Sequence, residues 1–338
     1  MNTLTIGPFA RVLLLGGGEL LVRLCDAARQ ASYEVAVITS PRHAAEAVDG
    51  ARLDARLEAL RIPHLTVDRI DTPEVRSFVG ARADAIALSV GAAWLFSPAA
   101  LDELFGGRLF NVHGTRLPEN RGGGGFSWQI LTGNRFGFCI VHRVDAGVDT
   151  GDVILCEEFL YPAGCRTPAD YQAHYTAQVV AHLSAVLADL RRAPRSFQLT
   201  SQPEYLSTYW PRLHTPTHAW INWDWSAAEI ERFICAFDDP YPGAQTTWNG
   251  GQISLKKASL NLQDLQAHPF QAGLVYRVHP KWICVAARGA ALVVEAVGDA
   301  HGASVLDRIR IGDRLFTAPA ALETAAQRVS YTPGGLKS

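Results

Sequence analysis

Short apolar segments alternate with amphipathic segments through the first half of the chain. Four runs rich in leucine or β-branched residues have the character of buried strands, at 11–15, 34–39, 85–90 and 108–113. Between these runs, apolar residues recur at helical spacing over 18–30, 44–61 and 97–105. Because strands that alternate with helices form parallel sheets, this half predicts an α/β fold with a Rossmann-like, doubly wound, mostly parallel sheet.

Two further apolar runs and a long helix extend this first domain. The runs at 138–144 and 152–159 are expected to be strands. Thr167 and Asp170 form a capping box, with proline at the first helical position between them, so we expect a helix that runs to about Arg192. We place the end of the domain, 1–200, shortly after that helix.

A proline-containing strap separates this domain from a second one. Residues 193–222 hold four prolines and show no regular period, so we expect a connecting segment, with the linker itself at 201–222. The second domain, 223–338, begins with a capping box at Ser226 and Glu229. Short alternating runs separated by turn residues follow, and they predict a smaller, OB-like β-barrel.

Composition and charge limit the class of protein. The chain has 338 residues, of which 48% are hydrophobic and 19% charged, and its formal net charge is -2. This balance gives no overall basic field for a polyanion, so nucleic acid is not the expected partner. Six cysteines without C-x-x-C spacing indicate neither a disulfide framework nor a zinc site, which favours a cytoplasmic protein. No apolar run reaches the ~18 residues that cross a bilayer, so no membrane association is expected.

The first chemical motif lies at the end of the strand at 108–113. Asn111 and His113 are two residues apart, so their side chains should share one face of that strand. Both lie at its carboxyl end, where open α/β sheets bind ligands, and a proline turn and the glycine run 122–125 follow. By itself, the pair also fits two residues that only hydrogen-bond the following turn.

A second motif carries Asp145, Asp149 and Asp152 among glycines. It fits a β-turn in which the carboxylates accept hydrogen bonds from nearby amides. A calcium loop is disfavoured because its third position is Gly147 and its twelfth is Cys156, where oxygen ligands are needed, and no metal is expected. The signatures of dinucleotide-binding loops, phosphate-binding P-loops and nucleophile elbows are absent from the sequence.

Together the two motifs resemble the folate-dependent formyltransferase family, which includes methionyl-tRNA and amino-sugar N-formyltransferases. The shared order is N-V-H-G-T-R-L-P, then R-G, and later V-D-A-G-V-D-T-G-D-V-I. The resemblance implies that Asn111, His113 and Asp149 are catalytic. The segment 221–260 likewise resembles the carboxyl-terminal region of methionyl-tRNA and UDP-aminoarabinose formyltransferases, so the resemblance covers nearly the whole chain.

The resemblance also implies a co-substrate, 10-formyltetrahydrofolate, and residues that bind it. The backbone of one loop is expected to hold the pterin ring beside a second turn; these residues are Asp145, Ala146, Gly147 and Val148, and Thr115, Arg116, Leu117 and Pro118. The sequence departs from the family pattern at Thr115, where serine is usual, at Arg116, where leucine is common, and at Gly123, where aminoarabinose formyltransferases have arginine. The function of the glycine run and the contacts to the acceptor are therefore left open.

The residue types of the trio suit this chemistry. Formyl transfer passes through a tetrahedral carbon that bears a negative oxygen, and the neutral Asn111 amide can donate to that oxygen. His113 can take the proton of the attacking amine and help to protonate N10 of the folate. Asp149 beside it is expected to raise the pKa of His113 and to fix its orientation. A nucleophilic enzyme is disfavoured because no cysteine lies in either motif.

We therefore expect a one-carbon group transferase that formylates a primary amine on a small molecule, such as a nucleotide-linked amino sugar. Methionyl-tRNA is the alternative acceptor, and the same trio fits a hydrolase that deformylates the folate, or a folate-binding protein without activity. In 39–63, arginines are interspersed with acidic residues and lysine is absent, which predicts an ion-paired surface helix rather than a basic tRNA-binding insertion. A homodimer is compatible with the sequence.

Overall fold

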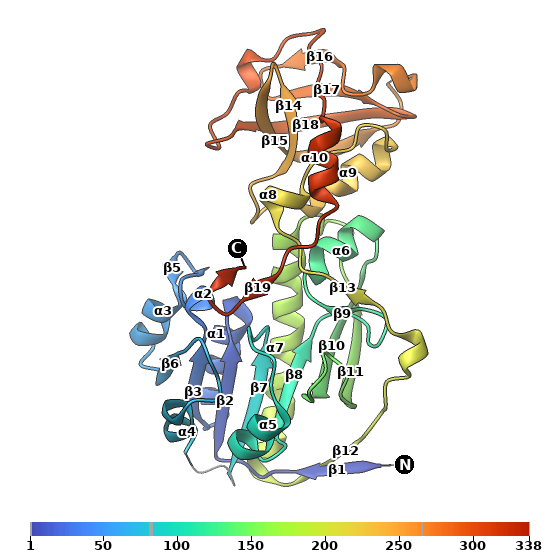
Figure 1. Ribbon diagram of the computed structural model, residues 1–338. Helices are drawn as coiled ribbons and strands as arrows, with labels where there is room; N and C mark the ends of the chain where they lie inside the picture. The colour runs from blue at the N-terminus through green and yellow to red at the C-terminus, as the bar shows by residue number, and fades with distance from the viewer. Residues whose placement is uncertain (1, 81–83, 265, 338) are drawn as a thin grey trace.

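The structure is a computed structural model that describes residues 2–80, 84–264 and 266–337, in two domains joined by a strap (Figure 1). The larger domain is built on a seven-stranded sheet with the order β11-β10-β8-β7-β2-β3-β6. These strands are β2 (Arg11–Gly16), β3 (Glu34–Thr39), β6 (His64–Thr66), β7 (Ala85–Val90), β8 (Leu109–His113), β10 (Phe136–Arg143) and β11 (Val153–Leu160). All neighbours from β8 to β6 are parallel, and β10 and β11 add an antiparallel edge. The prediction of a Rossmann-like, mostly parallel sheet is confirmed.

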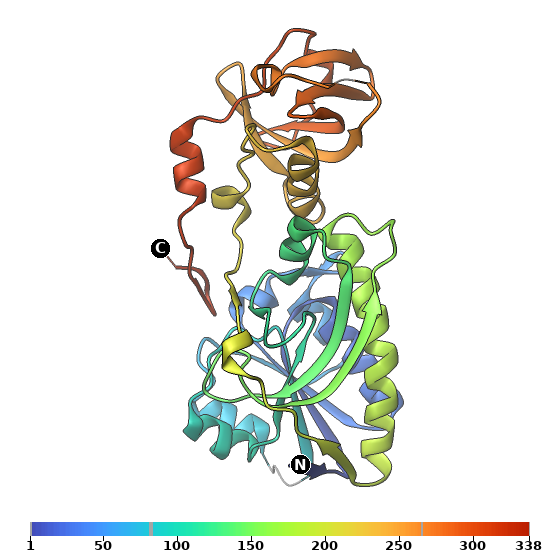
Figure 2. The ribbon, with the colours of Figure 1, turned by 90° about the vertical axis from the view of Figure 1, so that its right-hand side faces the viewer.

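Helices cover both faces of this sheet, as the side chains of β2 require. Val12 and Leu14 point into one core with α1 and α7, whereas Leu13 and Leu15 point into another with α4 and α5. The long α7 runs along the sheet in Figure 2, and its predicted capping box at Thr167 is present. These helices are α1 (Gly18–Gln30), α4 (Pro73–Val79), α5 (Pro98–Phe105) and α7 (Pro168–Arg192), and the shorter α6 (Gly125–Thr132) follows the glycine run.

The prediction of a single helix over 44–61 is wrong. Four short elements occupy this region, α2 (Pro41–Ala44), β4 (Ala47–Val48), β5 (Ala51–Arg52) and α3 (Leu53–Ala59). Asp49 and Gly50 have φ angles of +50° and +79°, and a right-handed helix cannot pass through two residues in that region. The expected pairing of arginine with acid does occur, because Arg56 lies 3.6 Å from Asp49 across the turn.

The strap lies against the larger domain over much of its length. β12 (Arg195–Gln198) pairs with β1 (Thr3–Ile6), and β13 (Tyr209–Trp210) pairs in parallel with β9 (Arg121–Gly122). One 3-10 turn, η1 (Glu204–Leu206), precedes β13, and a short helix, α8 (Thr215–His218), follows it. The pairing of β13 with β9 brings the strap to the glycine run that follows the first chemical motif.

The second domain is a small antiparallel barrel, as predicted. Its sheet has the order β14-β15-β18-β17-β16. Arg314 pairs with Leu274, next to β16, and Phe316 pairs with Thr247 on β14. The segment 314–316 thus connects the two edge strands and closes the sheet on itself. Helix α9 packs against the sheet with Ile230 and Ile234 buried. The elements are α9 (Ala227–Ala236), β14 (Ala244–Trp248), β15 (Gly251–Asn261), η2 (Pro269–Gln271), β16 (Val275–His279), β17 (Trp282–Ala287), β18 (Ala290–Asp299) and η3 (Leu306–Arg308).

After the barrel, the chain returns to the larger domain. Helix α10 (Pro319–Ala325) leads down to a hairpin of β19 (Tyr331–Thr332) and β20 (Gly335–Leu336), which lies beside α2 in Figure 1. The backbone N–H of Arg42 donates to the carbonyl of Pro333 at 3.3 Å. Among the described residues, no helix combines the length and apolar character that a membrane span requires.

Candidate active site

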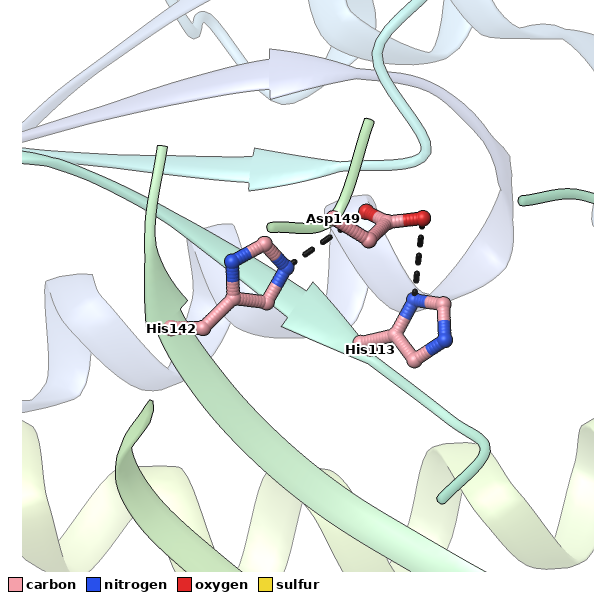
Figure 3. Close-up of side chains that lie close together, drawn as sticks. All are labelled: His113, His142 and Asp149. Atoms are coloured by element: carbon pink, nitrogen blue, oxygen red, sulfur yellow. Dashed lines mark ion pairs between the residues drawn. The ribbon is translucent and has the colours of Figure 1, made fainter. Parts of the chain in front are cut away.

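The sheet brings Asn111, His113 and Asp149 together, with His142 as a fourth member. Figure 3 shows the carboxylate of Asp149 between the rings of His113 and His142. Asn111 and His113 lie on the same face of β8, and Asp149 comes from the loop between β10 and β11. Because β10 is antiparallel to β8, His142 lies directly opposite Asn111. The cluster is largely buried, with side-chain exposures of 10% for His113, 2% for His142 and 15% for Asp149.

Hydrogen bonds on both sides fix the orientation of the Asn111 amide. Its Oδ1 accepts from the Ser89 hydroxyl at 2.8 Å, and its Nδ2 lies 3.1 Å from His142 Nε2 and 3.3 Å from Asp149 Oδ1. The other ring nitrogen of His142, Nδ1, faces the Arg143 carbonyl at 2.9 Å, so it carries the proton and Nε2 accepts from Asn111. One amide N–H is thus directed toward His142 and the other toward Asp149.

His113 is held as a base with one nitrogen available. Its Nε2 faces the Asn120 carbonyl at 2.9 Å and the Thr115 hydroxyl at 2.8 Å. Since a carbonyl only accepts, the neutral ring carries its proton on Nε2 and leaves a lone pair on Nδ1. That Nδ1 lies 3.8 Å from Asp149 Oδ2, close enough for the carboxylate to stabilise a proton taken up there.

The Asp149 carboxylate is held by several partners. Its Oδ2 accepts from the Gly122 backbone N–H at 2.9 Å, and its backbone φ of +55° is unusual for a residue other than glycine. Gln202 of the strap donates to the carbonyls of Asp149 and Gly151 at 2.9 and 2.7 Å, which fixes the loop in this conformation. Burial works to raise the pKa of Asp149, but the charge of His113, the contact with His142 and the Gly122 N–H outweigh it and lower the pKa to about 2.

The pKa of His113 is lowered overall, because burial outweighs the expected raising effect of Asp149. Burial lowers this pKa and is the largest influence, while Asp149 raises it by a smaller amount and His142 lowers it further. The carboxylate therefore moderates the cost of charging a buried imidazole instead of producing a stable imidazolium. His113 is neutral near pH 7, which is the form that a general base requires.

Sequence reasoning missed His142, although a signal for it existed. The residue lies in the predicted strand 138–144, but the partner of that strand was not assigned. Antiparallel pairing with β8, a feature that the predicted mostly parallel sheet does not specify, places His142 beside Asn111. His113, His142 and Asp149 have potential ligand atoms within 4.8 Å of one another, but a metal ion at His142 Nε2 would displace the hydrogen bond from Asn111.

The cluster opens into a cavity of about 750 Å³, a size typical of small-molecule sites. Of the residues expected to bind the folate, Thr115, Asp145, Gly147 and Val148 line this cavity. Arg116, Leu117, Pro118 and Ala146 do not, although all four belong to the two lining loops. The segments that line the cavity without having been predicted to do so include 89–96, from the end of β7 onward, the strap residues Tyr209, Pro211 and Arg212, and 328–331, which ends in β19.

Asp145 has a structural role in the loop that lines the cavity. Its Oδ1 accepts from the Gly147 backbone N–H at 3.1 Å and from the Thr150 hydroxyl at 2.5 Å. This matches the simpler interpretation of the motif, in which an aspartate accepts from the amides of its own turn. The loop backbone is thereby ordered while Asp145 stays exposed.

Gly122 cannot tolerate a side chain. Its φ is +100°, and a Cβ there would lie 2.4 Å from the Trp210 carbonyl oxygen. We expect Gly122→Ala to lower the free energy of unfolding by about 1–3 kcal/mol, measured by chemical denaturation. At Gly123, the nearest atom to a Cβ would be the Cβ of Arg212 at 3.4 Å, an ordinary contact, so Gly123→Ala should change stability by less than about 0.5 kcal/mol. Equal effects of the two substitutions would contradict this account of the glycine run.

Comparisons with known proteins agree with the motifs. The formyl transferase family model matches residues 10–176, and the model of the formyl transferase C-terminal domain matches 214–305. A methionyl-tRNA formyltransferase of Gluconobacter oxydans is 32% identical over 240 residues, which cover 71% of this chain and 72% of that protein.

Two solved structures have the same fold. One is WlaRD, a sugar 3N-formyl transferase in the presence of dTDP and 5-N-formyl-THF, with 18% identity, a TM-score of 0.61, and coverage of 85% of this chain and 97% of that one. The other is an N-formyltransferase from Helicobacter canadensis in complex with folinic acid and dTDP-3-aminofucose, with 16% identity, a TM-score of 0.62, and coverage of 85% and 99%.

Proposed function

Because this chain belongs to the formyltransferase family, we propose that it transfers a formyl group from 10-formyltetrahydrofolate to a primary amine of a small molecule. The resemblance predicted from the two motifs is thus confirmed at the level of the family. The observation that carries the proposal is the joint presence, in one cavity, of a directed Asn111 amide and a neutral His113 whose Nδ1 lies near Asp149.

The proposed reaction uses each member of the cluster. The amine attacks the formyl carbon, a C–N bond forms, and the carbonyl electron pair moves to oxygen. The Asn111 N–H gives up its long 3.3 Å contact with Asp149 and donates a hydrogen bond to the developing oxyanion instead. His113 Nδ1 takes a proton from the attacking nitrogen, and Asp149 stabilises the imidazolium. Return of that proton to N10 breaks the bond from the formyl carbon to N10 and releases the formamide and tetrahydrofolate.

The folate co-substrate is supported by the relatives and by the cavity. The two solved structures named above were described with 5-N-formyl-THF and with folinic acid. In this chain, Gly147 and Val148 offer ordered backbone at the cavity wall, which suits the alternating donors and acceptors of a pterin ring. We infer that this loop binds the pterin.

We propose a small acceptor rather than tRNA, a nucleotide-linked amino sugar being our preferred class. The two solved structures are described as a sugar formyltransferase and as a complex with dTDP-3-aminofucose, whereas the Gluconobacter relative carries the name of a tRNA formyltransferase. The region 41–59 folds into short elements, and Arg56 there is neutralised by Asp49. Arg52 of that region is likewise paired, with Asp54.

The salt response of the reaction separates the two acceptors. An enzyme that contacts 6 to 10 phosphates should lose roughly 10³-fold or more in affinity between 50 and 200 mM salt. We expect this protein to formylate a small amine with only a mild response to salt and to leave methionyl-tRNA unformylated. Formamide and formyl-methionyl-tRNA would be quantified by mass spectrometry. Efficient, steeply salt-sensitive formylation of charged initiator tRNA would overturn the proposed acceptor class.

The same assay tests a folate hydrolase as the alternative activity. Tetrahydrofolate release would be followed with and without a panel of amines that includes dTDP-linked amino sugars. A transferase releases tetrahydrofolate in step with formamide and only slowly without amine. Equal release in both conditions, with no formamide formed, would show that water is the acceptor.

A further inference from the structure

Part of the segment 327–337, which we call the C-terminal tail, forms one wall of the cavity. Arg328, Val329, Ser330 and Tyr331 of this tail line the same cavity as the catalytic cluster. The two family models match residues 10–176 and 214–305, so the tail lies outside both matched regions. The shared chemistry of the family therefore does not account for its position.

The tail is attached to the larger domain and the strap at several points. The Gln327 carbonyl lies 2.9 Å from His218 Nε2, and the Pro333 carbonyl accepts from the Arg42 backbone N–H at 3.3 Å. The Tyr331 ring is contacted by two guanidinium groups, with the Arg42 carbon at 5.7 Å and the Arg212 carbon at 5.0 Å from its centre. These contacts come from three distant parts of the sequence, so the wall exists only in the folded chain.

Positive charge is in excess at this wall. Arg212 and Arg328 line the cavity, and among the residues that the structure describes no carboxylate lies within ion-pair distance of either. Arg42, behind Tyr331, has its Nε and Nη1 buried without an acceptor in the described structure. Glu46 is the acidic side chain on this side of the cavity; its carboxylate lies 3.9 Å from His43 Nε2 and also feels the charges of Arg42 and Arg212.

The guanidinium groups affect one another and their neighbours. Burial, and then the charge of Arg212, lowers the pKa of Arg42. Burial followed by the charges of Arg42 and Arg212 lowers the pKa of His43 to about 3, so His43 is neutral near pH 7. The mutual repulsion of the Arg42 and Arg212 guanidinium groups on one ring is costly, and an anion placed at the wall would reduce that cost.

We propose that the C-terminal tail completes an anion-binding wall in the acceptor part of the cavity, where Arg212 and Arg328 bind a phosphate or carboxylate group of the amine acceptor. The acceptor part is indicated by Arg212, which packs on Gly123 of the glycine run, next to the Gly122 N–H that binds Asp149. The ring of Tyr331 contacts the guanidinium groups of Arg42 and Arg212 and so holds the tail in position beside them. This inference specifies the acceptor of the proposed function and rests on it.

Calorimetric titration of simple anions tests the wall without a known acceptor. Pyrophosphate, inorganic phosphate and malonate would be titrated into the full chain saturated with 5-formyltetrahydrofolate. We expect pyrophosphate to bind, and Arg212→Gln to weaken its affinity about tenfold, as loss of one charge-assisted hydrogen bond does. Arg328→Gln should act in the same direction. If pyrophosphate binds more tightly than malonate, the recognised group is a phosphate. If malonate binds more tightly, it is a carboxylate.

Tyr331 and a surface arginine supply the controls. Tyr331→Phe keeps the ring that contacts both guanidinium groups and should preserve anion affinity, whereas Tyr331→Ala should weaken it. Arg69→Gln removes the same charge at an exposed ion pair with Asp71 and should have no effect. Folding of each variant would be checked by its thermal unfolding and by its affinity for 5-formyltetrahydrofolate.

Several results would overturn this inference. The first is that none of the three anions binds, and the second is that Arg212→Gln leaves the affinity for pyrophosphate unchanged. The third is that Arg69→Gln weakens this affinity as much as Arg212→Gln does. The fourth is that Arg212→Gln weakens folate affinity in parallel, which would assign the arginines to the folate carboxylates. Failure of the proposed function is separate, because it would appear as an absence of formamide with every amine while anion binding still depended on Arg212.

Discussion

Replacement of His113 by Ala is expected to lower kcat for formyl transfer roughly 10²- to 10⁴-fold, because the variant loses the base that takes the proton of the attacking amine. Affinity for 5-formyltetrahydrofolate should change little, since the ring binds Asn120 and Thr115 through Nε2 and directs Nδ1 toward Asp149. Steady-state kinetics and calorimetric folate titration would measure the two effects. Exposed His301 in the second domain provides a matched control, and His301→Ala should leave both quantities unchanged.

The pH profile gives this prediction a second readout. Since the pKa of His113 is lowered from its ordinary 6.5, the base stays neutral as the pH falls through that value and is lost only at a lower pH. The acid limb of kcat/KM should therefore lie below pH 6.5, and His113→Ala should remove that limb. Near-normal turnover of a correctly folded His113→Ala protein would contradict the proposed mechanism.

Replacement of Asp149 by Asn is expected to reduce kcat by a comparable factor, roughly 10²-fold or more. The imidazolium formed at His113 loses its neighbouring negative charge, and the hydrogen bonds from Asn111 and Gly122 now meet a neutral amide. Because Asp149 raises the pKa of His113, its loss should move the acid limb of kcat/KM to a still lower pH. The profile would be recorded from pH 4 to 9.

The neighbouring carboxylate Asp145 is the matched control for charge. It lines the same cavity, but the hydrogen bonds that it accepts in the described part of the chain come from Gly147 and Thr150 of its own turn, so Asp145→Asn should keep kcat within a few-fold of the original value. An acid limb that moves to higher pH in Asp149→Asn would show that the carboxylate does not stabilise the protonated His113. An equal loss of kcat in both variants would show that Asp149 acts through general electrostatics.

The sequence determined the layered fold because its signal is periodic. Runs such as 11–15 and 85–90 are apolar at all but one position, as in a strand buried on both faces, and the structure has them as β2 and β7. The helix over 44–61 failed for a local reason, since helical spacing does not reveal that Asp49 and Gly50 adopt left-handed backbone. The caps at Thr167 and Ser226 could be identified because they depend on neighbours three residues apart.

The sequence also placed Asn111 and His113 on one face, because residues two apart in a strand must point the same way. Tertiary structure alone decided the rest of the site. Pairing of β10 with β8 brought His142 to Asn111, and burial reversed the expected shift in the pKa of His113. The tail and strap residues at the cavity, such as Tyr331 and Arg212, come from segments far apart in the chain. Periodicity reports on neighbours along the chain, whereas pairing register, desolvation and contacts between distant segments depend on the folded molecule as a whole.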